Sequence, residues 1–327
     1  MSAAIGEERV GAVLGRAEED ARPGLVLRVR EGAAGFWIWA LAGLSRRLPW
    51  VVTAVKPFFV RGTWWSSVSI RRGTMANARR ILGEGSTRRE RARLGRAVLG
   101  QVYEFFAEVG RNCGRPRKEM LQEVESIVGH EKLVAARASG RGAVIAVAHM
   151  GSYEVAAAAL REYEPDVAVV FKREARGHYE KLRRELHDRL GVHEAPVDDG
   201  LGVWFHLRDR LRANGVVLIQ ADRVMPGQKG VRVPFLGGHV EFPTGPVKLA
   251  MAAGCPIIPV FALRVGRAKV RIVIEDAIEV GDVSGGAGAA AHPALIRLVK
   301  LVERYVREHP DQWLLVTPAW VEDQERA

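Results

Sequence analysis

The sequence predicts an α/β fold in which helices flank a mostly parallel central sheet, preceded by a separate helical region. Short apolar runs alternate with helical segments from residue 140 onwards, an order typical of parallel strands joined by helices. Before residue 110, apolar residues instead recur at helical spacing between arginine-rich faces. The chain has 327 residues, of which 48% are hydrophobic and 27% charged, and this globular composition excludes a disordered or fibrous protein.

Four apolar runs are expected to be buried strands, because continuous apolar runs are typical of strands covered on both faces, and 270–275 is a further strand. The buried runs are 143–148, 167–171, 216–219 and 257–263. Helical patterns occupy 178–190, 201–213, 246–253 and an amphipathic terminal segment, 292–308. In such sheets functional side chains gather at the carboxyl ends of the strands.

Three regions follow along the chain. Residues 1–30, which contain an Arg22-Pro23-Gly24 break, are expected to be a flexible tail. Residues 31–110 should form a basic, tryptophan-rich helical region that associates with a membrane. Residues 111–327 should form the α/β domain that carries the chemistry.

The positive charge is concentrated in one segment. The chain has 49 Lys plus Arg against 38 Asp plus Glu, a net charge of +11. Residues 46–100 contain 13 basic and 2 acidic residues, so the rest of the chain sums to zero. Arginine pairs bidentately with phosphate, and this segment should therefore meet an anionic partner, although a GC-rich genome gives the same arginine bias.

The same region has the features of an interfacial membrane anchor. Residues 32–45 are uncharged, but 14 residues fall short of the roughly 20 that span a bilayer. Tryptophan prefers the headgroup level and basic side chains reach towards anionic lipid, which favours a membrane surface over nucleic acid. The alternative is a buried helix of the main domain. Five of the eight tryptophans lie here: Trp37, Trp39, Trp50, Trp64 and Trp65.

The cysteine pattern is compatible with a reducing compartment, and the first residues do not resemble a secretory signal. Cys113 and Cys255 are far apart and have neither disulfide-framework nor zinc-site spacing, and Cys255 should be a buried thiol. The first 20 residues carry five acidic residues, the wrong charge for a secretory signal.

The first candidate site follows the strand at 143–148. His149 and Glu154 are separated by a turn containing Gly151, with Ser152 as a helix N-cap. If the turn folds them together, the carboxylate can hold one imidazole nitrogen and leave the other as a general base. The alternative is a histidine that caps the sheet and a glutamate that decorates a helix N-terminus.

Two further candidate sites lie downstream. Asp222 and Arg223 follow the strand at 216–219, where Arg223 can hold a phosphate or developing negative charge, and Asp222 can orient it or form a surface ion pair. Thr244, Gly245 and Lys248 open a helix whose free amides can bind an anion, although such turns are common.

Together these segments resemble the bacterial lipid A biosynthesis (lauroyl/myristoyl) acyltransferases, within the glycerolipid-type acyltransferases that carry an H-x-x-x-x-D/E motif. The motif is His149-Met-Gly-Ser-Tyr-Glu154. The order and spacing of the other segments make the resemblance specific, and it covers about 36–320. These segments are RRGTMANARRILGEG (71–85), VLIQADR, VRVPFLGG, FPTGPVKLAMAAGCPIIPVF and HPDQWLLVTPAW (309–320).

The resemblance implies acyl transfer from an acyl thioester to a hydroxyl of a lipid or glycolipid acceptor, such as a lipid A precursor. His149 would be the general base and Glu154 would orient it, without a metal or cofactor. Arg223, with Asp222, and the turn at Thr244, Gly245 and Lys248 would contact substrate. The donor would be acyl carrier protein or acyl-coenzyme A, and the enzyme would act at the cytoplasmic face of the inner membrane.

Other interpretations remain open. The basic region alone would suffice for a non-enzymatic binder of anionic lipid, and the same His and Glu would serve a hydrolase. Ornithine lipids and mannosylated phosphoinositides are alternative acceptors. The aromatic residues Tyr103, Phe105 and Phe106 are expected in the core rather than in an acyl-chain pocket.

Overall fold

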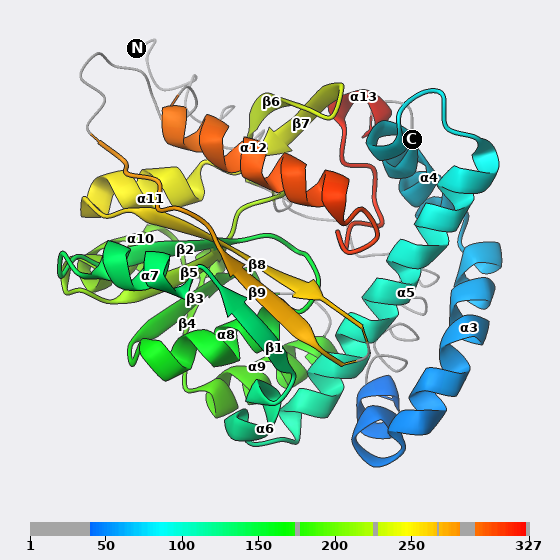
Figure 1. Cartoon of the computed structure of the whole chain (residues 1–327), viewed down its shortest axis with the longest axis horizontal. Helices are drawn as coiled ribbons and strands as arrows, with labels where there is room; N and C mark the ends of the chain where they lie inside the picture. Colours follow the sequence, from blue (N-terminus) through cyan, green and yellow to red (C-terminus); the bar gives the residue numbers. More distant parts are fainter. Residues whose placement is uncertain (1–39, 174–176, 225–227, 267, 282–291, 325–327) are drawn as a thin grey trace, which may run out of the picture.

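The computed structural model describes residues 40–173, 177–224, 228–266, 268–281 and 292–324. Figure 1 shows a sheet with helices on both faces and the helices of the N-terminal region along one side. The predicted tail, Trp37 and Trp39 lie outside the described residues. The sheet strands are β1 (Val124–Val128), β2 (Ala143–Val147), β3 (Val167–Phe171), β4 (His193–Pro196), β5 (Val216–Gln220), β8 (Ile257–Arg264) and β9 (Val270–Ile274), and a hairpin pairs β6 (Val231–Phe235) with β7 (Gly238–Phe242).

Helices cover both faces of the sheet and form the N-terminal region. Those of the α/β part are α6 (Arg117–Leu121), α7 (His130–Arg137), α8 (Tyr153–Tyr163), α9 (Gly177–Leu190), α10 (Leu201–Arg212), α11 (Gly245–Ala253), α12 (Pro293–Glu308) and α13 (Val321–Gln324), with a 3₁₀ turn, η1 (Val197–Asp199). Those of the N-terminal region are α3 (Pro49–Ser66), α4 (Val68–Leu82) and α5 (Arg88–Cys113).

The seven-stranded sheet has the order β1-β9-β8-β2-β5-β3-β4. The five strands β8, β2, β5, β3 and β4 are mutually parallel, which confirms the mostly parallel sheet. The other edge departs from that pattern. β9 returns antiparallel to β8 because the connection between them contains no helix, and β1 pairs parallel to β9.

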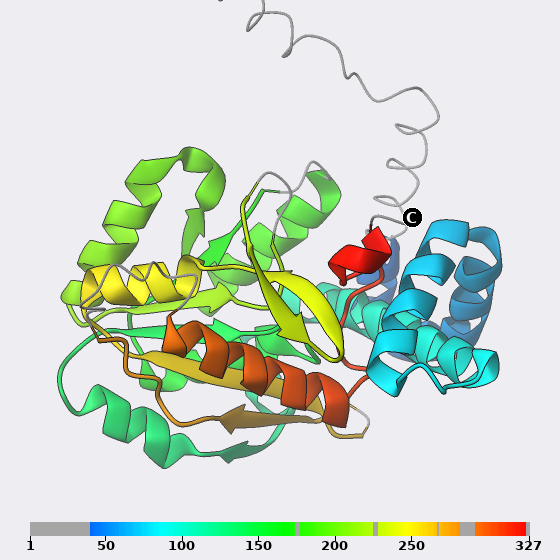
Figure 2. The ribbon, with the colours of Figure 1, turned by 90° about the horizontal axis from the view of Figure 1, so that it is seen from above.

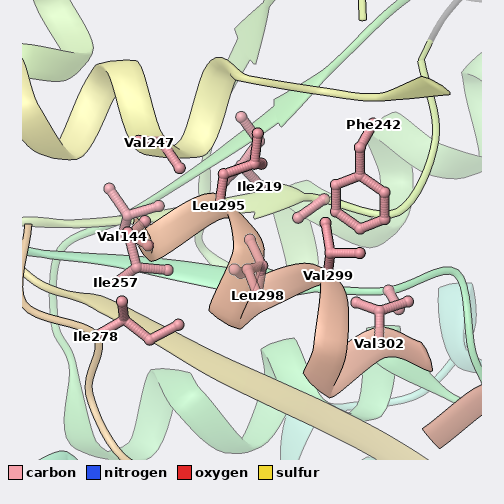
Figure 3. Close-up of a cluster of buried hydrophobic side chains, with 14 of the residues drawn as sticks. Val144, Ile219, Phe242, Val247, Ile257, Ile278, Leu295, Leu298, Val299 and Val302 are labelled. Atoms are coloured by element: carbon pink, nitrogen blue, oxygen red, sulfur yellow. The ribbon is translucent and has the colours of Figure 1, made fainter. Parts of the chain in front are cut away.

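Two apolar layers hold the sheet between the helices. Alternate residues of the buried strand β2 face opposite layers: Val144 packs towards α10, α11 and α12, whereas Ile145 packs towards α8 and α9. In Figure 3, Leu295 and Leu298 of α12 meet strand residues Val144 and Ile257. Burial of a leucine of this kind contributes ~2 kcal/mol. The strands therefore hold the loops at their carboxyl ends on a rigid base.

The N-terminal helices pack at one side of this α/β body. α5 begins with a capping box between Thr87 and Glu90 and packs against α3, α4 and α9. Trp64 is buried against Gly95 of α5, where a Cβ would lie 2.8 Å from the indole. In contrast, Trp50 and Trp65 are 68% and 77% exposed, so the predicted tryptophan cluster is divided between core and surface. None of the described helices is long and apolar enough to span a bilayer.

The end of the chain folds back across these helices. Figure 2 shows α13, in red, beside α4 and the β6–β7 hairpin. Arg79 and Arg80 of α4 both pair with the buried carboxylate of Asp323 in α13. The segment that precedes α13 thus runs between the helical region and the carboxyl edge of the sheet.

Candidate active site

Neighbouring parallel strands bring two of the predicted residues together. His149 lies two residues beyond the end of β2, and Asp222 lies two residues beyond the end of β5. Val147 and Gln220 are opposite each other in the β2–β5 pairing, so both loops emerge at the same point of the sheet edge. The two side chains, 73 residues apart in sequence, meet because the strands that carry them are neighbours.

His149 and Asp222 form a buried hydrogen-bonded pair. The Nδ1 atom of His149 lies 2.7 Å from Oδ1 of Asp222, and Oδ2 of Asp222 accepts a 2.8 Å hydrogen bond from Nε1 of Trp313. Burial alone would raise the pKa of Asp222, but His149, Arg223 and the Trp313 donor outweigh it and hold the pKa at about 2. The ionised carboxylate therefore accepts the Nδ1 proton and leaves Nε2 of His149 as a base.

The turn after His149 has room only for glycine. Gly151 has a φ of +54°, and a Cβ there would lie 1.9 Å from the carbonyl oxygen of Ala262. Ser152 follows as the N-cap of α8, as predicted, but its hydroxyl donates to the buried carboxylate of Glu108 in α5 instead of capping the helix. Arg264, at the end of β8, donates to the same carboxylate at 3.0 Å. The turn is thus fixed to both the sheet and α5.

His149 opens onto a cavity of about 880 Å³. This volume is within the range of small-molecule sites. The side formed by α3, α4 and α5 is mainly apolar, and the opposite side is mixed but holds the charged residues of the lining. The N-terminal helices contribute Val55, Phe59, Thr63, Ile70, Leu99, Val102, Tyr103, Phe105 and Phe106, and the opposite side contributes His149, Glu154, Lys172, Arg183, His187, Gln220 and Arg223.

The structure differs from two expectations about residues at this cavity. Tyr103, Phe105 and Phe106 were expected in the core, yet all three also line the cavity, because α5 lies between the α/β body and α3. The predicted hydrogen bond between His149 and Glu154 is replaced by the bond between His149 and Asp222. Glu154 instead projects from the first turn of α8, next to Glu108 and Arg183.

The environment of Glu154 differs from that of Asp222. Glu154 is 7% exposed, and its pKa is raised to about 7, mainly by burial and secondarily by the charge of Glu108, while Arg183 opposes the shift. Arg183 is itself committed to Glu180 and Glu194, each 2.5 Å away, and its guanidinium lies over the ring of Phe171. The carboxyl of Glu154 is therefore partly protonated at neutral pH.

The remaining predicted residues separate into two groups. Arg223 lines the cavity, and its buried Nε has no hydrogen-bond partner among the described residues. Asp222 does not pair with it as an isolated surface ion pair, because the carboxylate is occupied by His149 and Trp313.

Thr244, Gly245 and Lys248 lie at the start of α11, outside the cavity lining. Gly245 packs near Trp204 and Ile219, and Lys248 is exposed on the helix surface. The anion site predicted at this turn stays a prediction.

Sequence reasoning missed the role of Asp222 as the partner of His149. The signal was present, because both residues follow buried strands by the same two-residue offset. What the sequence lacked was the strand order, since β3 and β4 separate β2 from β5 along the chain. Trp313 carried no comparable signal, because it comes from a C-terminal segment outside the sheet.

Comparisons with known proteins agree with the motifs. The sequence model of a family described as bacterial lipid A biosynthesis acyltransferase matches residues 32–322. A phosphatidylinositol mannoside acyltransferase of Mycobacterium tuberculosis is 28% identical over 230 residues, covering 69% of this chain and 70% of the relative. One from Mycolicibacterium smegmatis is 29% identical over 231 residues, covering 70% and 72%. The chain belongs to the bacterial lipid A biosynthesis acyltransferase family and is an acyltransferase.

Proposed function

We propose that this acyltransferase moves a fatty acyl chain from an acyl thioester to a hydroxyl of a lipid or glycolipid acceptor, with His149 as the general base. The observation that carries the proposal is the buried His149–Asp222 pair opening onto a cavity with one apolar wall. The apolar wall suits an acyl chain, and the polar and charged side chains of the opposite wall suit the reacting carbonyl and the acceptor headgroup.

The proposed reaction is direct transfer. Nε2 of His149 takes the proton of the acceptor hydroxyl while its oxygen attacks the thioester carbonyl carbon and forms a C–O bond. Asp222 stabilises the imidazolium through Nδ1, as the carboxylate of a catalytic triad does. Collapse of the tetrahedral intermediate breaks the C–S bond, and the leaving thiolate takes the proton back from the imidazolium. The products are an ester and a free thiol.

Arg223 is proposed to meet negative charge in this reaction. Its Nε is buried and without a hydrogen-bond partner among the described residues, and its side chain lines the cavity. A guanidinium there can stabilise the developing oxyanion or hold an acceptor phosphate. Acyl carrier protein and acyl-coenzyme A both present the required thioester, and either is proposed as donor.

The relatives favour one acceptor among those considered. Proteins 28% and 29% identical to this chain are named phosphatidylinositol mannoside acyltransferases. We therefore infer that a mannosylated phosphoinositide is a better acceptor than a lipid A precursor or an ornithine lipid. Parallel assays with one thioester and these three acceptors, analysed by mass spectrometry, test the choice. Ester formed only on a lipid A precursor would contradict it.

The variant His149→Ala tests the proposed base. Transfer from an acyl thioester should fall at least 10³-fold, because the group that takes the hydroxyl proton in the proposed mechanism is removed. His206→Ala, which removes an exposed histidine on α10, is the matched control and should retain activity. Wild-type turnover in His149→Ala would contradict the mechanism. Thioester cleavage that does not require an acceptor would identify a hydrolase instead.

We also propose that the enzyme works on an anionic membrane surface, at the cytoplasmic face of the inner membrane. Trp50, Phe58 and Trp65 of α3 are each at least 68% exposed and fall within an arc of about 80° on one helix face. Neither α3 nor α4 contains an acidic residue, and Arg61 and Arg72 are exposed. Residues of α3 also line the cavity, so a lipid acceptor at this surface would be near His149.

Vesicle co-sedimentation tests the proposed membrane surface. Replacing Trp50, Phe58 and Trp65 with serine should abolish binding to phosphatidylglycerol vesicles. Serine at the exposed Leu201 and Phe205 of α10 is the matched control and should leave binding intact. Equal loss in both variants, or equal binding to phosphatidylcholine vesicles, would contradict an anionic-lipid surface on α3. Vesicle binding should persist in His149→Ala.

A further inference from the structure

The C-terminal segment contacts both members of the His149–Asp222 pair. Nε1 of Trp313 donates to Oδ2 of Asp222 at 2.8 Å, and the backbone amide of Leu314 donates to the carbonyl oxygen of His149 at 2.8 Å. The amide of Gly151 in turn donates to the carbonyl oxygen of Gln312 at 3.1 Å. Residues 312–314 therefore run beside the turn that carries the proposed base. Gln312 and Leu314 hold this turn through backbone hydrogen bonds.

The same segment is anchored at its far side by α4. The side-chain amide of Asn77 donates to the carbonyl oxygens of Leu315 and Thr317, and its oxygen accepts from the amide of Ala319. At Gly73, a Cβ would lie 2.3 Å from the carbonyl oxygen of Val316, so helix and segment are in direct backbone contact. The backbone that carries Trp313 is thus anchored to α4 as well as to the turn that holds His149.

Trp313 both packs in the core and donates a hydrogen bond to Asp222. It is 4% exposed and packs beside Phe235 and Trp320. Trp320 is equally buried, but its indole N–H donates to the backbone carbonyl of Phe235, away from the cavity. Of these two neighbouring tryptophans, only Trp313 directs its donor at a catalytic carboxylate. The pair therefore offers a comparison in which packing is matched and the hydrogen bond differs.

We infer that Trp313 is a positioning residue for acyl transfer: its indole N–H fixes the carboxylate of Asp222 so that Oδ1 faces Nδ1 of His149. This inference rests on the proposed function of His149 as base. One carboxylate oxygen is held from the C-terminal segment, and the other is free for the imidazole alone. The charged or aromatic groups that face the pair are Arg223 from the β5 loop and Tyr153 from α8.

Loss of the donor has a distinct kinetic consequence. Without it, the carboxylate rotates more freely and its charge is balanced only by the imidazole and Arg223, so the imidazole holds its proton more tightly. Transfer should slow in the chemical step, with little change in KM for the thioester. The acid-side limb of the kcat/KM profile should move to higher pH by about half a unit or more.

The test compares Trp313→Phe with Trp320→Phe in the full-length protein. We expect Trp313→Phe to lower kcat about tenfold and to shift the acid-side limb. Trp320→Phe should lower the thermal midpoint of unfolding as much as Trp313→Phe does, but it should leave the acid-side limb of the kcat/KM profile in place. A third variant carries 3-benzothienylalanine at position 313, which keeps the shape of the indole but lacks the N–H. It should lower kcat and shift the acid-side limb as Trp313→Phe does. This variant keeps the test valid if Trp313→Phe folds poorly.

Two outcomes would overturn the inference, and they differ from failure of the proposed function. A wild-type rate and profile in the benzothienylalanine variant, or identical profiles for the two phenylalanine variants, would show that Trp313 acts through packing only. His149→Ala, assayed alongside, separates the cases. Its activity at the wild-type rate would overturn the proposed function together with this inference, whereas an inactive His149→Ala with an unchanged benzothienylalanine variant overturns the inference alone.

Discussion

On the strand-end side of the cavity, the carboxylate of Asp222 is buried between two donors and its pKa is about 2. On the α8 side, Glu154 is buried to a similar degree, but its pKa is about 7. Burial raises the pKa of both groups, and what differs is the charge facing them. Asp222 meets His149 and Arg223, whereas Glu154 meets Glu108 and an Arg183 that is already paired.

This contrast shows why position in a motif does not fix a role. Glu154 is the acid of the H-x-x-x-x-E motif, yet the partner of His149 in the structure is a carboxylate from another strand. A group held ionised can stabilise an imidazolium throughout the reaction. A group that is partly protonated near neutral pH is poorly suited to that task.

Among variants of these two carboxylates, the largest expected effect is that of Asp222→Asn on catalysis. The amide can no longer accept the Nδ1 proton as a charged partner, so kcat should fall on the order of 10³-fold while the fold is kept. Steady-state kinetics with an acyl thioester, together with circular dichroism, check the prediction. A loss of less than tenfold would remove Asp222 from the proposed mechanism.

The second prediction concerns stability and Glu154. Its folded pKa of about 7 lies above the ordinary value of 4.5, so its contribution is fully present below pH 4.5 and is lost as the pH rises through 7. Glu154→Gln does not titrate, and from pH 4 to pH 8 it should gain about 3 kcal/mol of unfolding free energy relative to wild type. Urea unfolding at both pH values measures this gain. Parallel changes in the two proteins would show that folding does not raise the pKa of Glu154.

Asp222 should show the opposite dependence. Its folded pKa of about 2 lies below the ordinary 3.8, so its contribution is present above pH 3.8 and is lost as the pH falls through 2. Between pH 5 and pH 2, wild type should lose about 2 kcal/mol more than Asp222→Asn. Urea unfolding across this range tests the sign, and a greater loss in the variant would contradict it.

The smallest expected effect is that of Glu154→Gln on catalysis. Glu154 lines the cavity without being the Nδ1 partner of His149, so kcat at pH 8 should fall less than tenfold. The same assay as for Asp222→Asn gives the comparison. A loss equal to that of Asp222→Asn would show that Glu154, the acid of the motif, orients His149.

The sequence was sufficient for elements with a strong local pattern. The apolar runs at β2, β3, β5, β8 and β9 and the amphipathic α12 were expected within about two residues of their ends. The short, mixed strands β1 and β4 and the β6–β7 hairpin were not predicted, because charged residues and proline interrupt their apolar pattern. The local pattern also identified His149 as a candidate site residue, because a polar residue directly follows a buried strand there.

Tertiary arrangement supplied the rest of the site. The pairing of His149 with Asp222 depends on β2 and β5 being neighbours, and the donor from Trp313 depends on a C-terminal segment that α4 anchors. Phe105 and Phe106 line a cavity only because α5 stands between α3 and the sheet. None of these relations is encoded in spacing along the chain, so no periodicity could predict them.

The most direct test of the account is proton NMR of the His149 ring in protein labelled with ¹⁵N-histidine. We expect a strongly downfield Nδ1–H resonance, hydrogen-bonded to Asp222, that persists in Glu154→Gln and disappears in Asp222→Asn. A resonance that is kept in Asp222→Asn and lost in Glu154→Gln would contradict the assignment of Asp222 as the partner of the base.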